Sequence, residues 1–311
     1  SRMALSMPHL LGLEGVSRED ITTILDTADN FHDVLQRDIP QVPTLRGKTI
    51  VNLFFENSTR TRISFELAEK RLSASPLSFS STTSSVKKGE SLRDTIRNLE
   101  AMKIHMVVCR HSSPGAALFL THCTDAVVIN AGDGSHEHPT QALLEMMTIR
   151  RKLDRLEGLR VAIIGDILHS RVARSNAWGM RTMGMEVTLC GPPPLLPQHP
   201  ESLGVHVTDS IEEALEEVDV VMMLRLQLER QTSGLFPSIR EYRARYGLDS
   251  ERVDTLLKNN VLIMHPGPIN RGIELASTVA DSSQSVILDQ VTNGVAVRMA
   301  VLYLLGGGEN A

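Results

Sequence analysis

The sequence predicts an α/β protein with two domains, each built on a doubly wound, mainly parallel sheet. The 311 residues are enough for about two domains of roughly 150 residues each. Short apolar strands alternate with helical stretches, which is typical of a parallel sheet covered by helices. The pattern L-x-G-x-x-[IV] occurs at residues 45–50 and again at 156–161, each time before a strand and a helix. Two α/β halves of similar build would explain this repeat.

The first helix is expected at residues 10–36. Ser17 opens it and Asp20 follows three residues later, which is an acidic variant of the capping box. Apolar residues between Ile21 and Phe31 recur at helical spacing, and Pro40 ends the segment.

The strands that follow are short and apolar, and helices connect them. Strands are expected at residues 49–55, 104–108, 126–130, 161–165, 186–190, 218–223 and 261–265. Further helices are expected at residues 61–72, 139–156 and 295–305, of which the second connects the halves and the third could pack back on the first half. We therefore expect a first domain at residues 1–148, completed by a C-terminal helix at 293–311, and a second domain at 149–292. Sheets of this kind bind ligands at the carboxyl ends of their strands.

Charge and cysteine content exclude several kinds of protein. The chain has 32 Lys and Arg against 37 Asp and Glu, and the net charge of −5 argues against nucleic-acid or anionic-membrane partners. Its three cysteines are unclustered, which favours a reducing cytoplasm over a disulfide framework or a zinc site. No apolar run approaches the roughly 18 residues of a membrane span, and no signal-peptide pattern is present. We expect a cytoplasmic protein that binds neither membranes nor nucleic acid.

The segment Phe-Glu-Asn-Ser-Thr-Arg-Thr-Arg at residues 55–62 follows a predicted strand and opens a predicted helix. Unpaired backbone N–H groups and the positive end of the helix dipole lie at such a start. Ser58, Thr59 and Thr61 add hydroxyl groups, and Arg60 adds a planar cation. Together these groups suit a phosphate dianion.

An alternative is a well-capped helix with surface arginines. Arg62 fits that structural role, because Glu66 follows it at the i,i+4 spacing of a helical ion pair. Other familiar phosphate motifs are missing: the sequence has no P-loop, and Gly-Asp-Ile-Leu-His-Ser at residues 165–170 is not G-x-G-x-x-G. A nicotinamide dinucleotide is therefore disfavoured.

Residues 80–90 form a long polar stretch with two adjacent lysines, Lys87 and Lys88. Composition alone indicates a solvated surface loop. A hydroxyl-rich loop that ends in Lys-Gly can also be a lid that brings a cation to an anionic ligand.

The segment at residues 132–141 begins a helix and allows three interpretations. His136 and His138 could bind a metal ion, with Asp133 as a third ligand. Alternatively, His138 donates a hydrogen bond, and Gln141, one turn later on the same face, reads a substrate amide. The segment could also be only a capped helix start. A metal is the less favoured interpretation, because no second histidine-rich cluster is obvious.

Three arginines, Arg110, Arg171 and Arg225, each come just after an apolar strand, where they could face a shared ligand cleft. Gln227 lies two residues after Arg225, so in an extended chain both side chains point the same way. The rigid turn His-Pro-Gly-Pro at residues 265–268 follows the last predicted strand, and its carbonyl groups could face a ligand.

Taken together, these segments resemble the aspartate/ornithine carbamoyltransferase family over nearly the whole chain. Residues 58–62 resemble its carbamoyl-phosphate signature, and His-Pro-Thr-Gln at 138–141 matches its second motif. Lys-Lys-Gly-Glu at 87–90, Arg-Leu-Gln at 225–227 and His-Pro-Gly-Pro at 265–268 resemble the branch whose acceptor is aspartate. The His-Cys-Leu-Pro turn and the Ser-Met-Gly loop of the ornithine branch are not present.

The resemblance implies roles for the matching residues. The residues implied in carbamoyl-phosphate binding carry hydroxyl, amide, imidazole or cationic groups, or lie in the 265–268 turn. They are Ser58, Thr59, Arg60, Thr61, Ser84, Lys88, Arg110, His138, Gln141, Gly267 and Pro268. Those implied in aspartate binding are Lys88, Arg171, Arg225 and Gln227. Those implied in catalysis are Arg60, Thr61, Arg110, His138 and Lys88. Gly267 departs from relatives that have leucine there, which loosens the side-chain contact but leaves the Pro268 carbonyl in place.

The implied reaction is transfer of a carbamoyl group from carbamoyl phosphate to the amine of L-aspartate, an early step of pyrimidine synthesis. The amine attacks directly through a tetrahedral intermediate, so neither a covalent enzyme intermediate nor a metal or other cofactor is required. The family's unit is a homotrimer, in which Ser84 and Lys88 reach the site of a neighbouring subunit, and the active site lies in the cleft between the two domains and at the subunit interface. Whether such trimers join regulatory or dihydroorotase-like chains is left open by the sequence.

Three other functions fit parts of the sequence. A metal-dependent amidohydrolase would use His136 and His138, and a catalytically silent family member would serve as an assembly subunit. A carbamoyltransferase with another acceptor, such as ornithine, is the nearest enzymatic alternative. The intact set of matching residues favours the aspartate reaction.

Overall fold

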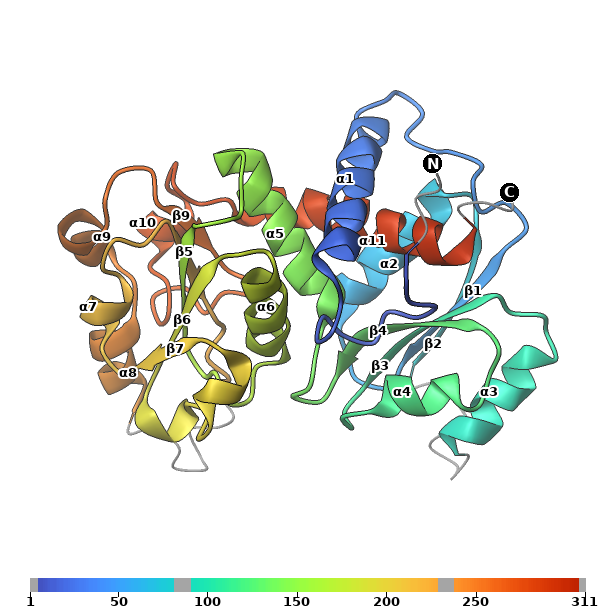
Figure 1. Cartoon of the computed structure of the whole chain (residues 1–311), viewed down its shortest axis with the longest axis horizontal. Helices are drawn as coiled ribbons and strands as arrows, with labels where there is room; N and C mark the ends of the chain where they lie inside the picture. The colour runs from blue at the N-terminus through green and yellow to red at the C-terminus, as the bar shows by residue number, and fades with distance from the viewer. Residues whose placement is uncertain (1–4, 81–90, 229–237, 308–311) are drawn as a thin grey trace. The chain divides into compact units, whose positions relative to one another are not determined.

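The computed structural model describes residues 5–80, 91–228 and 238–307 (Figure 1). Its contacts divide the chain into two compact units. Unit 1 comprises Ser1–Met147 and Thr292–Ala311, and unit 2 comprises Thr148–Val291. Each unit contains one parallel sheet, so the predicted α/β fold with two parallel-sheet domains is confirmed.

The sheet of unit 1 has four parallel strands in the order β2-β1-β3-β4. These strands are β1 (Thr49–Phe54), β2 (Ser75–Ser80), β3 (Met106–His111) and β4 (Val127–Asp133). The helices that begin in this unit are α1 (Arg18–Leu35), α2 (Thr59–Arg71), α3 (Leu92–Glu100), α4 (Ala116–Thr121) and α5 (Pro139–Leu153). The last helix, α11 (Ile287–Gly306), returns the chain to unit 1.

Successive side chains of each strand point to opposite faces of this sheet, and helices pack on both faces. Val51 and Leu53 of β1 pack with Ile96 of α3 and Leu120 of α4 in one apolar cluster. Helices α1, α2 and α11 lie on the other side of the sheet (Figure 1). Asn52 points to that side and donates to Glu69 of α2 over 2.7 Å. A doubly wound sheet needs both layers, since a parallel sheet buries both of its faces.

The sheet of unit 2 has five parallel strands in the order β7-β6-β5-β8-β9. These are β5 (Arg160–Ile164), β6 (Glu186–Cys190), β7 (His206–Thr208), β8 (Val220–Met223) and β9 (Leu262–Met264). The helices are α6 (Arg171–Thr182), α7 (Ile211–Ala214), α8 (Ile239–Tyr246), α9 (Ser250–Leu256) and α10 (Ser277–Ala280), with short 3₁₀ turns at Pro193–Leu195 and Pro200–Leu203. One large cluster joins Ile164 and Met223 of the sheet to Tyr242 and Tyr246 of α8.

Three details differ from the sequence prediction. The first helix starts at Arg18 and not at residue 10, because Ser17 caps it and the backbone before it includes Gly15 at φ 77°. The preceding Leu10 instead pairs with β4, where its amide donates to Val128 O over 3.0 Å. Strands β2 and β7 were not predicted, because β2 contains a proline and β7, His-Val-Thr, has a single apolar residue. The C-terminal helix begins at Ile287 and not at 293, and its described part ends at Gly306.

Helix α11 is also the longest helix in the described ranges, with 20 residues. Neither it nor any other helix within the described ranges combines the length and hydropathy that a bilayer crossing requires.

Candidate active site

In unit 1 the predicted substrate residues follow three adjacent strands. Residues 58–61 come after β1, Arg110 is the next-to-last residue of β3, and His138 follows β4. Strands β1, β3 and β4 are neighbours and run parallel, so their carboxyl ends meet at one edge of the sheet. The chain order reverses between β1 and β3, which is the place where open α/β sheets bind ligands.

The start of α2 has the features of an anion site. Ser58 caps the helix, because its Oγ accepts from the Thr61 amide at 3.4 Å. The first turn of α2 contains no acidic residue, so nothing there offsets the positive end of the helix dipole. Arg60 is exposed and, within the described ranges, makes no hydrogen bond or ion pair. An incoming phosphate would meet backbone N–H groups, hydroxyl groups and a guanidinium together.

Arg110 joins the end of β3 to this helix start. Its Nη1 donates to Thr61 Oγ1 over 3.4 Å and to Ala131 O over 3.1 Å. Its Nε lies 3.4 Å from Oε1 of Glu56, which was not among the site residues predicted from the sequence. Two of the predicted catalytic residues, Thr61 and Arg110, are therefore in direct contact. Burial lowers the pKa of the neighbouring His111.

A hydrogen-bond network holds the loop before His138. Asp133 Oδ1 accepts from the Asn130 amide side chain at 2.8 Å and from the Glu137 backbone N–H at 3.1 Å. His138 itself is 4% exposed. Gln141 lies in the first turn of α5, three residues after His138.

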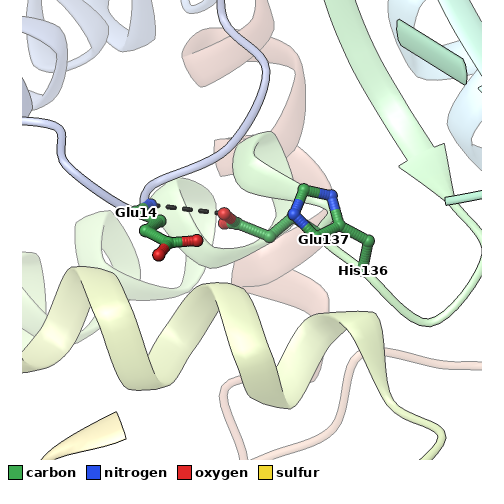
Figure 2. Close-up of side chains that lie close together, drawn as sticks. All are labelled: Glu14, His136 and Glu137. Atoms are coloured by element: carbon green, nitrogen blue, oxygen red, sulfur yellow. Dashed lines mark hydrogen bonds between the residues drawn. The ribbon is translucent and has the colours of Figure 1, made fainter. Parts of the chain in front are cut away.

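Among the described residues, one group of histidine and carboxylate side chains could hold a metal ion, namely Glu14, His136 and Glu137 (Figure 2). His138, a metal ligand in one interpretation of the sequence, is not part of this group. The Glu137 carboxylate is 1% exposed and accepts from the backbone amides of Leu13 at 2.6 Å and Glu14 at 3.2 Å. These bonds tie the chain before α1 to the start of α5, so a structural reason accounts for this buried carboxylate.

In unit 2 the predicted residues again follow three adjacent parallel strands. Arg171 is the first residue of α6, after β5; Arg225 comes two residues after β8; and Gly267 and Pro268 follow β9. Strands β5, β8 and β9 are neighbours, and the chain order reverses between β5 and β8. Both units therefore bring their predicted residues to the edge of the sheet where ligands bind.

The two arginines that the sequence predicts to bind aspartate differ in their surroundings. Ser170 caps α6, since its Oγ accepts from Ala173 N at 3.0 Å, and this places Arg171 in the first helical turn. The Nε of Arg225 is buried and has no hydrogen-bond partner among the residues that the structure describes, and Gln227 is exposed. A buried guanidinium N–H without a partner is a ready donor for a carboxylate.

The 265–268 turn contains a cis peptide bond between Gly267 and Pro268. Gly267 has φ 73°, in the left-handed region that disfavours side chains, which explains a glycine at this position. Ser84 and Lys88 lie outside the described residues.

One buried cation near the site was missed by sequence reasoning. Arg298 of α11 is 4% exposed, donates from Nη1 to Ser64 Oγ over 3.0 Å, and lies over the Phe65 ring at 5.1 Å. Burial, with a smaller effect of nearby Arg110, lowers its pKa to about 9. Its signal in the sequence was a single arginine within the otherwise apolar stretch at residues 295–305.

Comparison with known families gives two matches that together span most of the chain. The carbamoyl-P binding domain of aspartate/ornithine carbamoyltransferase matches residues 8–151. The Asp/Orn binding domain of the same family matches residues 157–305.

Individual relatives are similar over nearly their full length. The aspartate carbamoyltransferase catalytic subunit of Syntrophotalea carbinolica is 59% identical over 307 residues, which are 99% of this chain and 98% of that protein. Among solved structures, Trypanosoma cruzi aspartate transcarbamoylase in complex with carbamoyl phosphate and aspartate has a TM-score of 0.86 at 32% identity, covering 96% of each chain. Ornithine carbamoyltransferase from Pyrococcus furiosus has a TM-score of 0.86 at 28% identity, covering 99% of each chain.

Proposed function

The chain belongs to the aspartate/ornithine carbamoyltransferase family, and from this we infer that it transfers the carbamoyl group of carbamoyl phosphate to the amine of L-aspartate. The products are N-carbamoyl-L-aspartate and phosphate, and the reaction belongs to pyrimidine biosynthesis. The observation that carries this inference is 59% identity to an aspartate carbamoyltransferase catalytic subunit over 99% of the chain.

For unit 1 we propose that Ser58, Thr59, Arg60 and Thr61 hold the phosphate group of carbamoyl phosphate. The capped, acid-free start of α2 supports this role. Thr61, Arg110 and His138 polarise the carbamoyl oxygen, and the contact between Arg110 and Thr61 supports their acting together. Gln141 holds the carbamoyl NH₂ group with the Pro268 carbonyl, beside Gly267.

For unit 2 we propose that Arg171, Arg225 and Gln227 bind the two carboxylates of aspartate. Their position after the adjacent strands β5 and β8 supports this role, as does the Nε of Arg225, which has no partner within the described ranges. Lys88 adds a further cation from a neighbouring subunit, together with Ser84.

These groups would catalyse the reaction by position and charge. Holding two anionic reactants in line contributes about 7–11 kcal/mol, and each donor to the oxyanion of the tetrahedral intermediate contributes about 3 kcal/mol. The amine attacks the carbamoyl carbon, the C–O bond to phosphate breaks, and the leaving phosphate accepts the proton of the amine. A negatively charged chain thus binds anions because Arg60, Lys88, Arg110, Arg171 and Arg225 act on the same reactants.

The test is formation of carbamoyl-aspartate by purified protein supplied with both substrates. Arg60→Ala is expected to lower kcat about 10²–10³-fold, the effect of removing one donor to developing charge. Lys70→Ala, which removes an exposed charge at the far end of α2, is the matched control and should leave kcat near wild type. Absence of product with aspartate, or product with ornithine instead, would contradict the proposal.

We further propose a cytoplasmic homotrimer with shared sites, which family membership and three free cysteines support. If sites are shared, inactive Arg60→Ala and Lys88→Ala proteins regain activity when their subunits are mixed, because some sites then pair an intact Arg60 with an intact Lys88. Mixtures that stay inactive after subunit exchange would exclude a shared site. Light scattering gives the size of the assembly and shows whether other chains are needed for it.

A further inference from the structure

A hydrogen-bond chain in unit 2, buried at its centre and half-buried at its two ends, links two segments that carry proposed substrate residues. At one end, the Asn270 side chain donates from Nδ2 to Leu226 O over 2.7 Å. Leu226 lies between Arg225 and Gln227, and its side chain is 1% exposed. The bond therefore fixes the backbone of the segment whose neighbouring side chains are proposed to bind aspartate.

The middle of the chain is Glu274. The backbone N–H of Asn270 donates to Glu274 Oε1 over 2.7 Å, and the same oxygen lies 3.0 Å from His265 Nε2. The side chains of Glu274 and His265 are 0% exposed. Hydrogen bonds in such a dry environment are strong and geometrically demanding, since no water can replace a lost partner.

The other end is the 265–268 turn. The Gly267 N–H donates to His265 Nδ1 over 2.7 Å. Because Nδ1 accepts this bond, the ring proton lies on Nε2, which donates to Glu274 Oε1. The backbone of His265 is held in turn, since its N–H donates to Gln290 Oε1 over 3.2 Å. The chain Leu226–Asn270–Glu274–His265–Gly267 thus has a defined donor and acceptor at every step.

We propose that Asn270 is a positioning residue for aspartate binding, holding the 225–227 segment in register with the 265–268 turn through Glu274 and His265. The inference rests on the substrate roles proposed above and adds a residue that contacts no substrate. Removing the Asn270 side chain frees Leu226 O but leaves the backbone bond to Glu274 intact. The aspartate end should therefore loosen while the turn keeps its position.

The first experiment compares Asn270→Ala with Tyr246→Phe. Tyr246 is also in unit 2, is 1% exposed, and donates from its OH to a backbone carbonyl, Asp209 O, over 2.8 Å. Both variants delete one hydrogen bond to a main-chain carbonyl, so they should lose similar stability. Asn270→Ala is expected to raise KM for aspartate about five- to tenfold, with KM for carbamoyl phosphate within twofold of wild type. Tyr246→Phe should change neither KM.

A second variant gives a readout that a loss of stability would not produce. Asn270→Asp places an ionised carboxylate against Leu226 O at neutral pH, where two acceptors repel each other. When protonated it donates again, so the ratio of its aspartate KM to that of wild type should fall towards one as pH falls.

An Asn270→Ala enzyme with the KM values of Tyr246→Phe would overturn the positioning role. So would a KM ratio for Asn270→Asp that does not change with pH. Neither result would contradict the proposed reaction, which is tested separately by carbamoyl-aspartate formation by the unmodified protein.

Discussion

In unit 1 most of the proposed phosphate residues belong to one short segment, whereas in unit 2 the proposed aspartate residues come from separate segments after β5 and β8. The unit 1 segment needs only a strand end and the capped start of α2 to take its shape. The 225–227 segment of unit 2 depends in addition on Asn270 and on the buried Glu274 and His265 behind it.

The buried polar groups behind the two sites also differ. In unit 2, Glu274 Oε1 accepts from two donors. Within the described residues, Glu69 of unit 1 has one donor to its carboxyl group, and Arg298 has two nitrogen atoms, Nε and Nη2, without a partner. Glu274 of unit 2 therefore holds the backbone of its own unit through one oxygen, although its Oε2, like Oε2 of Glu69 in unit 1, has no partner in the described part of the chain.

The largest expected effect on stability comes from Glu69. Burial raises its pKa to about 8, against the opposing hydrogen bond from Asn52 and with a smaller contribution from Glu66. The folded protein then keeps this proton up to about pH 8, while the unfolded chain releases it above about pH 4.5. The free energy of unfolding should consequently fall as pH rises through this window, by on the order of 4 kcal/mol from this group.

Urea unfolding of wild type and Glu69→Gln between pH 5 and 8 measures the effect. Glutamine keeps the acceptor for Asn52 but does not titrate, so its stability relative to wild type should grow as pH rises. Glu186→Gln, which alters an exposed glutamate beside Arg160, is the control and should show little pH-dependent difference. A constant difference between wild type and Glu69→Gln would mean that Glu69 is ionised in the folded protein.

The sequence predicted the parallel-sheet fold and the strands that form continuous apolar runs, because a short apolar run between turns or helices is a local signal. It could not predict β2, whose serines and proline form an edge strand only because β1 lies beside it. The same limit applies to the site. Residues 58–62 are readable as one motif, but Asn270 and Glu274 become partners of Leu226 and His265 only through tertiary structure. Glu56 likewise gains a role only when β3 brings Arg110 to it.

The next prediction concerns the loss of stability that results from burying the Arg298 guanidinium in unit 1. A buried N–H group without a partner costs about 1–3 kcal/mol, and Arg298 has two nitrogen atoms in this state. Arg298→Met is therefore expected to raise the free energy of unfolding by about 1–3 kcal/mol at pH 7, because an apolar side chain of similar length replaces an uncompensated charge. Inorganic phosphate, measured as an inhibitor against carbamoyl phosphate, should bind several-fold more weakly, since Arg298 adds to the positive potential at Arg110.

Arg271 of unit 2 provides the comparison for that variant. It is exposed and forms a two-pronged pair with Asp281 at 3.1 and 3.2 Å. Arg271→Met should change stability by less than about 1 kcal/mol and leave phosphate inhibition unchanged. Loss of stability in Arg298→Met would show instead that the bond to Ser64 and the Phe65 contact outweigh the cost of burial.

The smallest expected effects come from three serines that each cap the N-terminus of a helix. Ser17 caps α1 at 3.1 Å, Ser58 caps α2 at 3.4 Å and Ser170 caps α6 at 3.0 Å. Each serine-to-alanine change should lower the free energy of unfolding by about 1 kcal/mol. Their kinetics should differ, because only Ser58 is proposed to touch phosphate and only Ser170 precedes a proposed aspartate-binding arginine. Ser58→Ala should therefore raise KM for carbamoyl phosphate, Ser170→Ala KM for aspartate, and Ser17→Ala neither. If Ser58→Ala loses stability like the others but keeps its KM, the α2 start is a helix cap and the anion is held elsewhere.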